Sequence, residues 1–126
     1  MNTSDRLYAV RGAVCCENTV ESIGSRVSEL YSLLLAQNSV SECDIVSVQF
    51  TMTADLDALN PATALRKAGM ASSVPLFAAA EPFIRGGMPR VVRILLTYYG
   101  SRAGSPVYLH GAEKLRPDLI GASAGV

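Results

Sequence analysis

The most chemically suggestive residue in the sequence is Arg93, which stands inside an apolar run of Val, Ile and Leu at 91–96. Such a run predicts a central strand that is buried on at least one face. An unpaired guanidinium there would cost roughly several kcal/mol, so Arg93 needs an anionic partner. Two interpretations stay open. One is an internal ion pair with a carboxylate such as Glu81. The other is a site that excludes water, in which Arg93 binds a ligand anion or a negative charge that develops during a reaction.

Arg11 is a second arginine on an otherwise apolar strand face. Residues 7–16 alternate in the manner of a strand, with a break at Gly12, and residues 90–99 alternate in the same way around Arg93. The chain contains nine arginines but only two lysines. Because arginine binds carboxylates and phosphates in a rigid bidentate geometry, this bias favours a small anion as the ligand.

Length and composition limit the class of protein. The chain has 126 residues, of which 49% are hydrophobic, and a net charge of zero. This predicts a single domain over 1–126, with a flexible tail at 120–126, and argues against a nucleic-acid partner. No apolar segment reaches the roughly 20 residues of a membrane span, and the N-terminus lacks the pattern of a signal peptide. We therefore expect a cytoplasmic protein with no membrane partner.

The three cysteines and the single histidine, His110, do not form a recognisable catalytic set. Cys15 and Cys16 are neighbours that would point to opposite faces of a strand, and no cysteine pair has the spacing of a zinc site. We interpret the cysteines as reduced packing residues. The sequence therefore predicts neither a metal site nor a nucleophilic Cys-His or Ser-His-Asp site.

Hydrophobic periodicity predicts alternating helices and strands. A long helix is expected to begin with a cap at Asn18 and to end near residue 37, and a strand follows at 44–53. A short helix at 61–68 has Asn60 as its N-cap and Gly69 just past its end. Further strands are predicted at 74–80, 90–99 and 106–110, before a helical turn at 112–118.

This order of elements predicts an α+β fold, with a mixed sheet and the long helix on one face. The other face lacks cover. In the strand at 44–53 one side is apolar, with Val46, Val48, Phe50 and Met52. We expect that side, or its opposite, to be left open by the helix and buried by subunits that pack around a common axis.

Six motifs, taken in order, resemble one known family. They are RGA at 11–13, TADL and NPA followed by Arg66 within 53–66, VP at 74–75, Glu81, the GG-x-x-R-x-x-R spacing that ends at Arg93, and VYL with LRPDL within 107–119. Together they resemble the α/β-barrel class of chorismate mutase over nearly the whole chain. The resemblance implies a homotrimeric pseudo-α/β-barrel with active sites between adjacent subunits. It implies rearrangement of chorismate to prephenate, in aromatic amino-acid biosynthesis, without a cofactor.

The resemblance also implies roles for individual residues. Arg93 matches the family's cation beside the breaking ether bond, Glu81 its carboxylate for the ring hydroxyl, and Arg11 the arginine of its first strand. The implied substrate-binding residues are Tyr108 and Arg116, then Asn60, Ala62, Thr63 and Arg66 from the neighbouring subunit, and an apolar wall of Leu115, Leu76, Phe77 and Ala78.

The sequence departs from the family pattern at two positions, and two other functions stay open. The family often has an aromatic residue at the position of Asn60 and a lysine at that of Thr63, so a weaker affinity or a somewhat different substrate is compatible with the sequence. One alternative is a deaminase-like trimer that hydrolyses reactive imines or enamines. The other is a non-catalytic homologue that binds a small anion. The LRPDL ending and the position of Glu81 favour the mutase.

Overall fold

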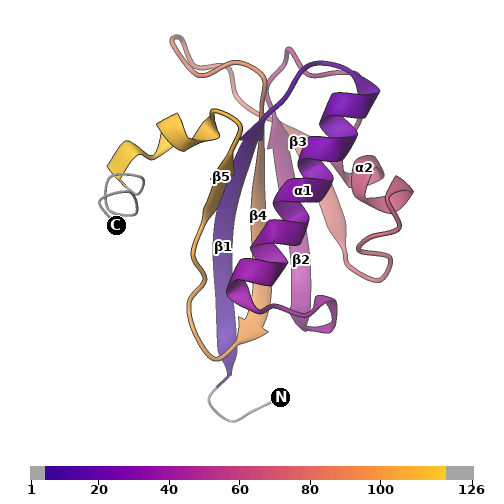
Figure 1. The fold of residues 1–126 in the computed structure, drawn as a ribbon, viewed down its shortest axis with the longest axis vertical. Coiled ribbons are helices and arrows are strands. Elements are labelled where there is room, and N and C mark those ends of the chain that lie inside the picture. The colour runs from indigo at the N-terminus through magenta and orange to yellow at the C-terminus, as the bar shows by residue number, and fades with distance from the viewer. Residues whose placement is uncertain (1–4, 119–126) are drawn as a thin grey trace.

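The computed structural model describes residues 5–118. They form a mixed five-stranded sheet with two helices on one face (Figure 1). This confirms the predicted α+β class, while the predicted tail at 120–126 lies outside the described residues. The elements are β1 (Arg6–Cys15), α1 (Val20–Asn38), η1 (Glu42–Asp44), β2 (Ile45–Met52), α2 (Pro61–Lys67), β3 (Leu76–Ala80), β4 (Val91–Gly100), β5 (Val107–Leu109) and η2 (Ala112–Leu115).

The central strand of the sheet is β4, within the order β3-β2-β4-β1-β5. It runs antiparallel to β1 and β2, whereas β3 is parallel to β2 and β5 is parallel to β1. The prediction of a central strand around Arg93 is therefore confirmed. The register places Arg93 between Ala13 of β1 and Thr51 of β2, and it places Arg11 opposite Leu95.

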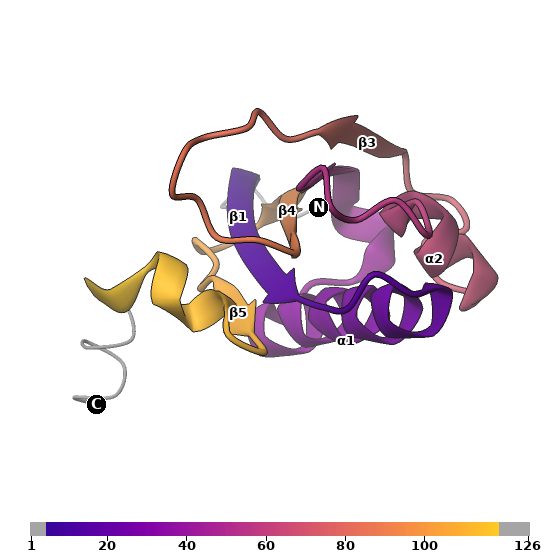
Figure 2. The same cartoon turned by 90° about the horizontal axis from the view of Figure 1, so that it is seen from above.

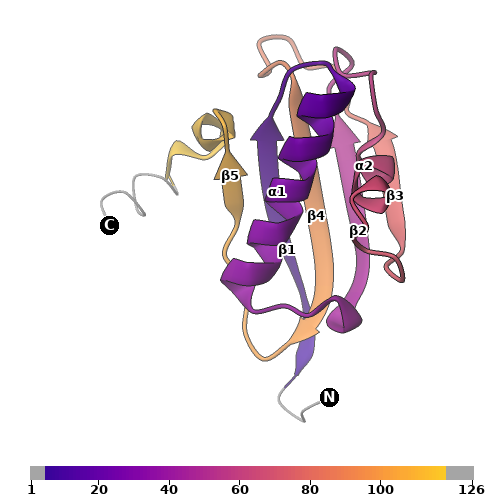
Figure 3. The ribbon, with the colours of Figure 1, turned by 45° about the vertical axis from the view of Figure 1, so that its right-hand side comes forward.

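The hydrophobic core lies between the sheet and α1. The helix runs diagonally across the sheet (Figure 3), and both helices lie on the same side of it when seen from above (Figure 2). Each fully buried aliphatic or aromatic side chain in this layer contributes roughly 1.5–3 kcal/mol relative to exposure. No helix within residues 5–118 is long and apolar enough to cross a membrane. The buried residues of α1 are Ile23, Val27, Leu30, Tyr31 and Leu34.

The cap of α1 differs from the prediction. Thr19, rather than Asn18, accepts the hydrogen bond from Ser22 N, over 3.0 Å. Asn18 Oδ1 instead accepts from the backbone N–H groups of Asp57 and Ala58, at 3.0 Å each. Both residue types cap helices well, and the tertiary contact with the loop before α2 decides between them.

The strand β1 runs through Gly12 without the predicted break. A Cβ atom at Gly12 would lie 2.8 Å from the carbonyl oxygen of Val107 and 3.1 Å from Leu30 Cδ1. Glycine is therefore needed because β5 and α1 approach the backbone of β1 closely at this point.

The uncovered side of the sheet, called the open face below, is not the one formed by Val48 and Phe50. These two side chains are buried in the core. A register shift between Ile45 and Ser47 breaks the alternation and leaves Val46 42% exposed. The open face carries the opposite side chains of the strands, and four of its large apolar or aromatic side chains are at least 36% exposed. They are Leu7, Phe77, Leu95 and Tyr99.

Candidate active site

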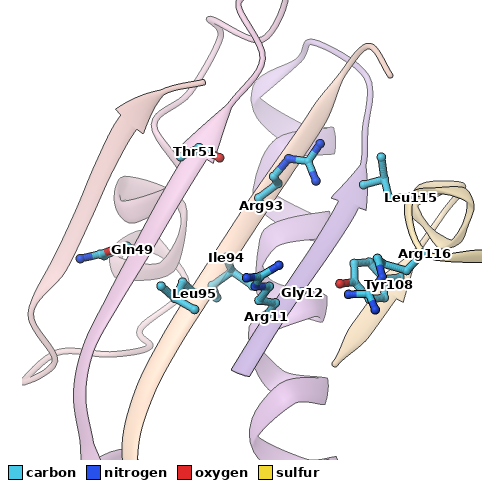
Figure 4. A pocket seen from close by; sticks show the side chains of 10 residues that line it. All are labelled: Arg11, Gly12, Gln49, Thr51, Arg93, Ile94, Leu95, Tyr108, Leu115 and Arg116. Atoms are coloured by element: carbon cyan, nitrogen blue, oxygen red, sulfur yellow. The ribbon is translucent and has the colours of Figure 1, made fainter. Parts of the chain in front are cut away.

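A groove of about 460 Å³ lies on the open face (Figure 4). Its floor is formed by β1, β2 and β4, and its side wall by β5 and the residues of and after η2. Three arginines from separate elements reach it, which suits a ligand with more than one negative charge. The lining residues are Arg11, Gly12, Gln49, Thr51, Arg93, Ile94, Leu95, Tyr108, Leu115 and Arg116.

Arg93 forms an ion pair with Glu81, which was one of the two interpretations left open by the sequence. Its Nε donates to Glu81 Oε1 over 2.7 Å, and the side chains are 41% and 16% exposed, respectively. Within the described part of the chain, the two terminal amino groups of Arg93 have no hydrogen-bond partner. Figure 4 shows the guanidinium extending from β4 at the groove. The ion pair therefore fixes one edge of the guanidinium and leaves the other edge available for a ligand anion.

Glu81 is held from two sides. Its backbone N–H donates to Met52 O over 2.9 Å, which fixes the chain where β3 ends. Its Oε1 also accepts a hydrogen bond from Thr51 Oγ1 over 2.9 Å. Sequence reasoning missed Thr51. Its only signal was a place on the polar side of β2, and nothing in the local pattern indicates that β2 lies beside β4.

Arg11 lies on the groove floor, where no residue in the described part of the chain forms an ion pair with it. Among residues 5–118, no carboxylate lies within salt-bridge distance of its guanidinium, so Glu81 pairs with Arg93 and not with Arg11. Its register partner on β4 is Leu95, which is 36% exposed on the same face. Arg11 is thus a second charged group that is free to bind a ligand.

The side wall of the groove packs on a small cluster of its own. Ala13, Val91 and Ala112 are buried on the open face, and Tyr108 and Leu115 pack against them. This cluster explains how η2, far along the chain, reaches the sheet next to Arg93.

Arg116 follows η2 and binds Asp118 through two hydrogen bonds, Nε to Oδ1 at 3.1 Å and Nη2 to Oδ2 at 2.9 Å. This pairing raises the pKa of Arg116 above its ordinary value, so the residue is charged at any working pH. Pro117, which lies within the helical turn predicted at 112–118, has helical backbone geometry. The structure therefore brings together five of the predicted residues: Arg11, Arg93, Tyr108, Leu115 and Arg116, with Glu81 behind Arg93.

The predicted residues of α2 are not brought to this groove within one chain. Asn60 is the predicted N-cap, and its Oδ1 accepts from Ala62 N over 2.8 Å. Arg66 Nη2 donates to the backbone oxygen of Val74 over 2.9 Å, and Thr63 is exposed. Because α2 lies on the helix-covered side of the sheet, these side chains can meet a groove only in another copy of the chain.

The predicted apolar wall from β3 is also absent from the groove. Leu76 and Ala78 pair with Val48 and Phe50 in the register of β2, so they face the helices and pack against the core. Phe77 faces the open side and is 67% exposed. Alternation along a strand separates the two faces, but it does not reveal which face carries the site.

The family model described as chorismate mutase type I matches residues 7–119. The chain belongs to the chorismate mutase type I family. It is 37% identical over 118 residues to chorismate mutase AroH of Thermus thermophilus, an alignment that covers 90% of this chain and 96% of that protein. It is 30% identical over 117 residues to chorismate mutase AroH of Bacillus subtilis (strain 168), with 90% and 92% covered.

A solved chorismate mutase from Clostridium thermocellum has the same fold. The TM-score is 0.80 at 32% sequence identity, and the superposition covers 84% of this chain and 97% of that one. The resemblance drawn from the six motifs is thus confirmed. Membership of this family favours the mutase over the deaminase-like trimer.

Proposed function

We propose that the protein is an isomerase that rearranges chorismate to prephenate in aromatic amino-acid biosynthesis. Arg93 carries this proposal: Glu81 fixes its Nε, and Arg93 lines a groove that Arg11 and Arg116 also line. The [3,3] rearrangement is intramolecular and requires no nucleophile, proton transfer or cofactor. A site built from arginines and a carboxylate therefore suits it.

Arg93 is proposed to act on the ether oxygen of the substrate. As the C–O bond breaks, negative charge collects on that oxygen, and a fixed cation stabilises the transition state more than the ground state. The contribution is roughly 3–4 kcal/mol if it resembles the loss of one oxyanion donor. The pair with Glu81 supports this role because the guanidinium does not have to reorganise during the reaction.

The other polar groups of the groove are proposed to select the reactive shape of the substrate. Arg11, Arg116 and Tyr108 approach from the floor and the side wall, where they can bind the two carboxylates of chorismate. Binding both ends in the compact conformer removes orientational freedom before the reaction begins. Glu81 Oε2, which has no hydrogen-bond partner within residues 5–118, is the proposed acceptor for the ring hydroxyl.

A homotrimer with its sites between subunits is the second part of the proposal. The exposed side chains of the open face, such as Phe77 and Leu95, need cover. A neighbouring copy would supply this cover, and it would bring Asn60, Ala62, Thr63 and Arg66 of its α2 to the groove. Light scattering at micromolar concentration tests this, and a stable monomer would refute it.

The reaction is tested by adding chorismate to the purified protein and following the loss of its ultraviolet absorbance, with and without a chelator. We expect turnover in both samples. Chorismate that binds without being consumed would instead support the non-catalytic anion-binding alternative. The cytoplasmic location stays a prediction from the sequence.

A further inference from the structure

Thr51 and Arg93 bind the same oxygen of Glu81. They are register partners across the β2–β4 pair. Thr51 Oγ1 donates to Glu81 Oε1 over 2.9 Å, and Arg93 Nε donates to that oxygen over 2.7 Å. One carboxylate oxygen therefore links a strand hydroxyl to a strand guanidinium, and no residue within 5–118 binds the second oxygen, Oε2.

The side chain of Glu81 needs this support because the chain leaves the sheet at this residue, although its backbone N–H is fixed on Met52 O. It is the first residue after β3, and most of the segment at 82–90 that follows is exposed. Thr51 is inside β2, which pairs with β3 on one side and β4 on the other. Its β-branched side chain is also stiff at χ1. The hydroxyl of Thr51 is thus the rigid point of attachment for the carboxylate.

We propose that Thr51 is a positioning residue: it fixes Glu81 Oε1 and, through this oxygen, the direction of the Arg93 guanidinium, and it leaves Oε2 for the substrate. Its kinetic consequence rests on the proposed function, whereas its structural consequence does not. Misplacement of a catalytic group by about 1 Å can cost about 10²-fold in rate. Loss of the hydroxyl should therefore lower kcat more than it changes KM.

Three single variants test the kinetic consequence. Thr51→Val keeps the shape and removes the donor, and Thr51→Ser keeps the donor. Thr97→Val is the matched control, because Thr97 is half-buried on the same face of the sheet, does not line the groove, and its hydroxyl has no hydrogen-bond partner among residues 5–118. We expect Thr51→Val to lower kcat about tenfold with KM within twofold, Thr51→Ser to recover most of this, and Thr97→Val to match the wild type. Wild-type kcat in Thr51→Val would overturn the proposal.

A double-mutant cycle with Glu81→Ala separates positioning from other roles. If Thr51 acts only through Glu81, then adding Thr51→Val to Glu81→Ala should change kcat less than twofold. A further tenfold loss in that background would mean that the hydroxyl acts directly on the substrate or on the fold, and the proposal would be wrong.

A third measurement needs no substrate. The Nε–H signal of Arg93, identified in the NMR spectrum by its loss in Arg93→Lys, should exchange with solvent at least threefold faster in Thr51→Val and at the wild-type rate in Thr97→Val. A wild-type protein that does not consume chorismate would refute the proposed function, and this signal would still decide the positioning role. An unchanged exchange rate in Thr51→Val would refute that role.

Discussion

The groove has arginines on two sides, which are built differently. One side is its floor of β1, β2 and β4, called the sheet wall below, and the other is the side wall of β5 and η2. Arg93 stands in the central strand β4, and its partner Glu81 comes from another part of the chain. Arg116 follows a four-residue 3-10 helix, and its partner Asp118 is only two residues away. The side wall is attached to the sheet mainly through the three-residue strand β5, which lies at the edge of the described sheet and pairs there with β1. The sheet wall is therefore the more rigid of the two.

The difference in rigidity suits two different tasks in catalysis, stabilisation of the transition state and binding of the substrate. A group that stabilises charge appearing only in the transition state must be in place beforehand, which suits the sheet wall. A group that clamps a carboxylate contributes about equally to ground and transition states, and it can tolerate a wall that moves. Mutations in the two walls should thus affect different kinetic constants.

Arg93→Ala should have the largest effect. We expect kcat to fall about 10²–10³-fold, which corresponds to roughly 3–4 kcal/mol, while KM changes much less. Steady-state kinetics with chorismate measure both constants. If kcat stays within about tenfold while KM rises strongly, Arg93 is a clamp like Arg116 and the contrast between the walls is lost.

The control for this variant is its fold. Removal of Arg93 leaves the mostly buried carboxylate of Glu81 without its cation, which can itself destabilise the protein. Light scattering and a thermal melt must therefore match the wild type before the kinetics are interpreted. The double variant Arg93→Ala with Glu81→Ala removes the orphan charge and should be no more active.

Arg116→Ala should act on binding. We expect KM to rise about tenfold, equivalent to about 1.4 kcal/mol, with kcat within about threefold, because a carboxylate clamp contributes to both states. A loss in kcat as large as that of Arg93→Ala would mean that the side wall is as rigid and as catalytic as the sheet wall.

Arg66→Ala distinguishes a role within one chain from a role in a neighbour's site. Loss of its bond to Val74 O should lower the free energy of unfolding by about 1 kcal/mol. If Arg66 also clamps substrate in an adjacent subunit, KM should rise several-fold as well. A lower melting temperature with an unchanged KM would restrict Arg66 to its own chain.

The smallest effects are expected from pH and from His110. His110 contacts Glu29, with Nε2 and Oε1 2.8 Å apart, and does not line the groove, so His110→Ala should keep the wild-type kcat. Activity should vary little between pH 6 and 8 because no group transfers a proton. A steep titration of kcat near pH 7 would contradict a purely electrostatic mechanism.

Stability, by contrast, should depend on alkaline pH. Burial raises the pKa of Cys16 to about 11 from an ordinary value of 9.0. Above pH 9 the unfolded thiol loses its proton while the folded thiol keeps it, so the free energy of unfolding should fall as pH rises from 9 to 11. Below pH 9 both thiols are protonated, and this group should cause no change of stability with pH. Denaturant melts at pH 8 and pH 10.5 measure the difference, which should shrink in Cys16→Ala.

Local chemistry could be predicted from the sequence, but contacts across the sheet could not. The cap at Asn60 and the need of Arg93 for an anion follow from neighbouring residues alone. Thr51 was missed because its link to Arg93 depends on the β2–β4 register, which no local pattern contains. Leu76 and Ala78 were misplaced for a related reason, since alternation sorts side chains into two sets without saying which set faces the helices.

Gly12 determines how far the side wall of the groove lies from its floor. Since the carbonyl of Val107 would lie 2.8 Å from any Cβ at this site, the residue without a side chain sets how near β5, and Tyr108 with it, comes to the floor. A larger residue at position 12 would have to push β5 outward. The width of the groove is therefore encoded separately from its charges, so the size of substrate that fits could be altered by engineering while every arginine stays in place.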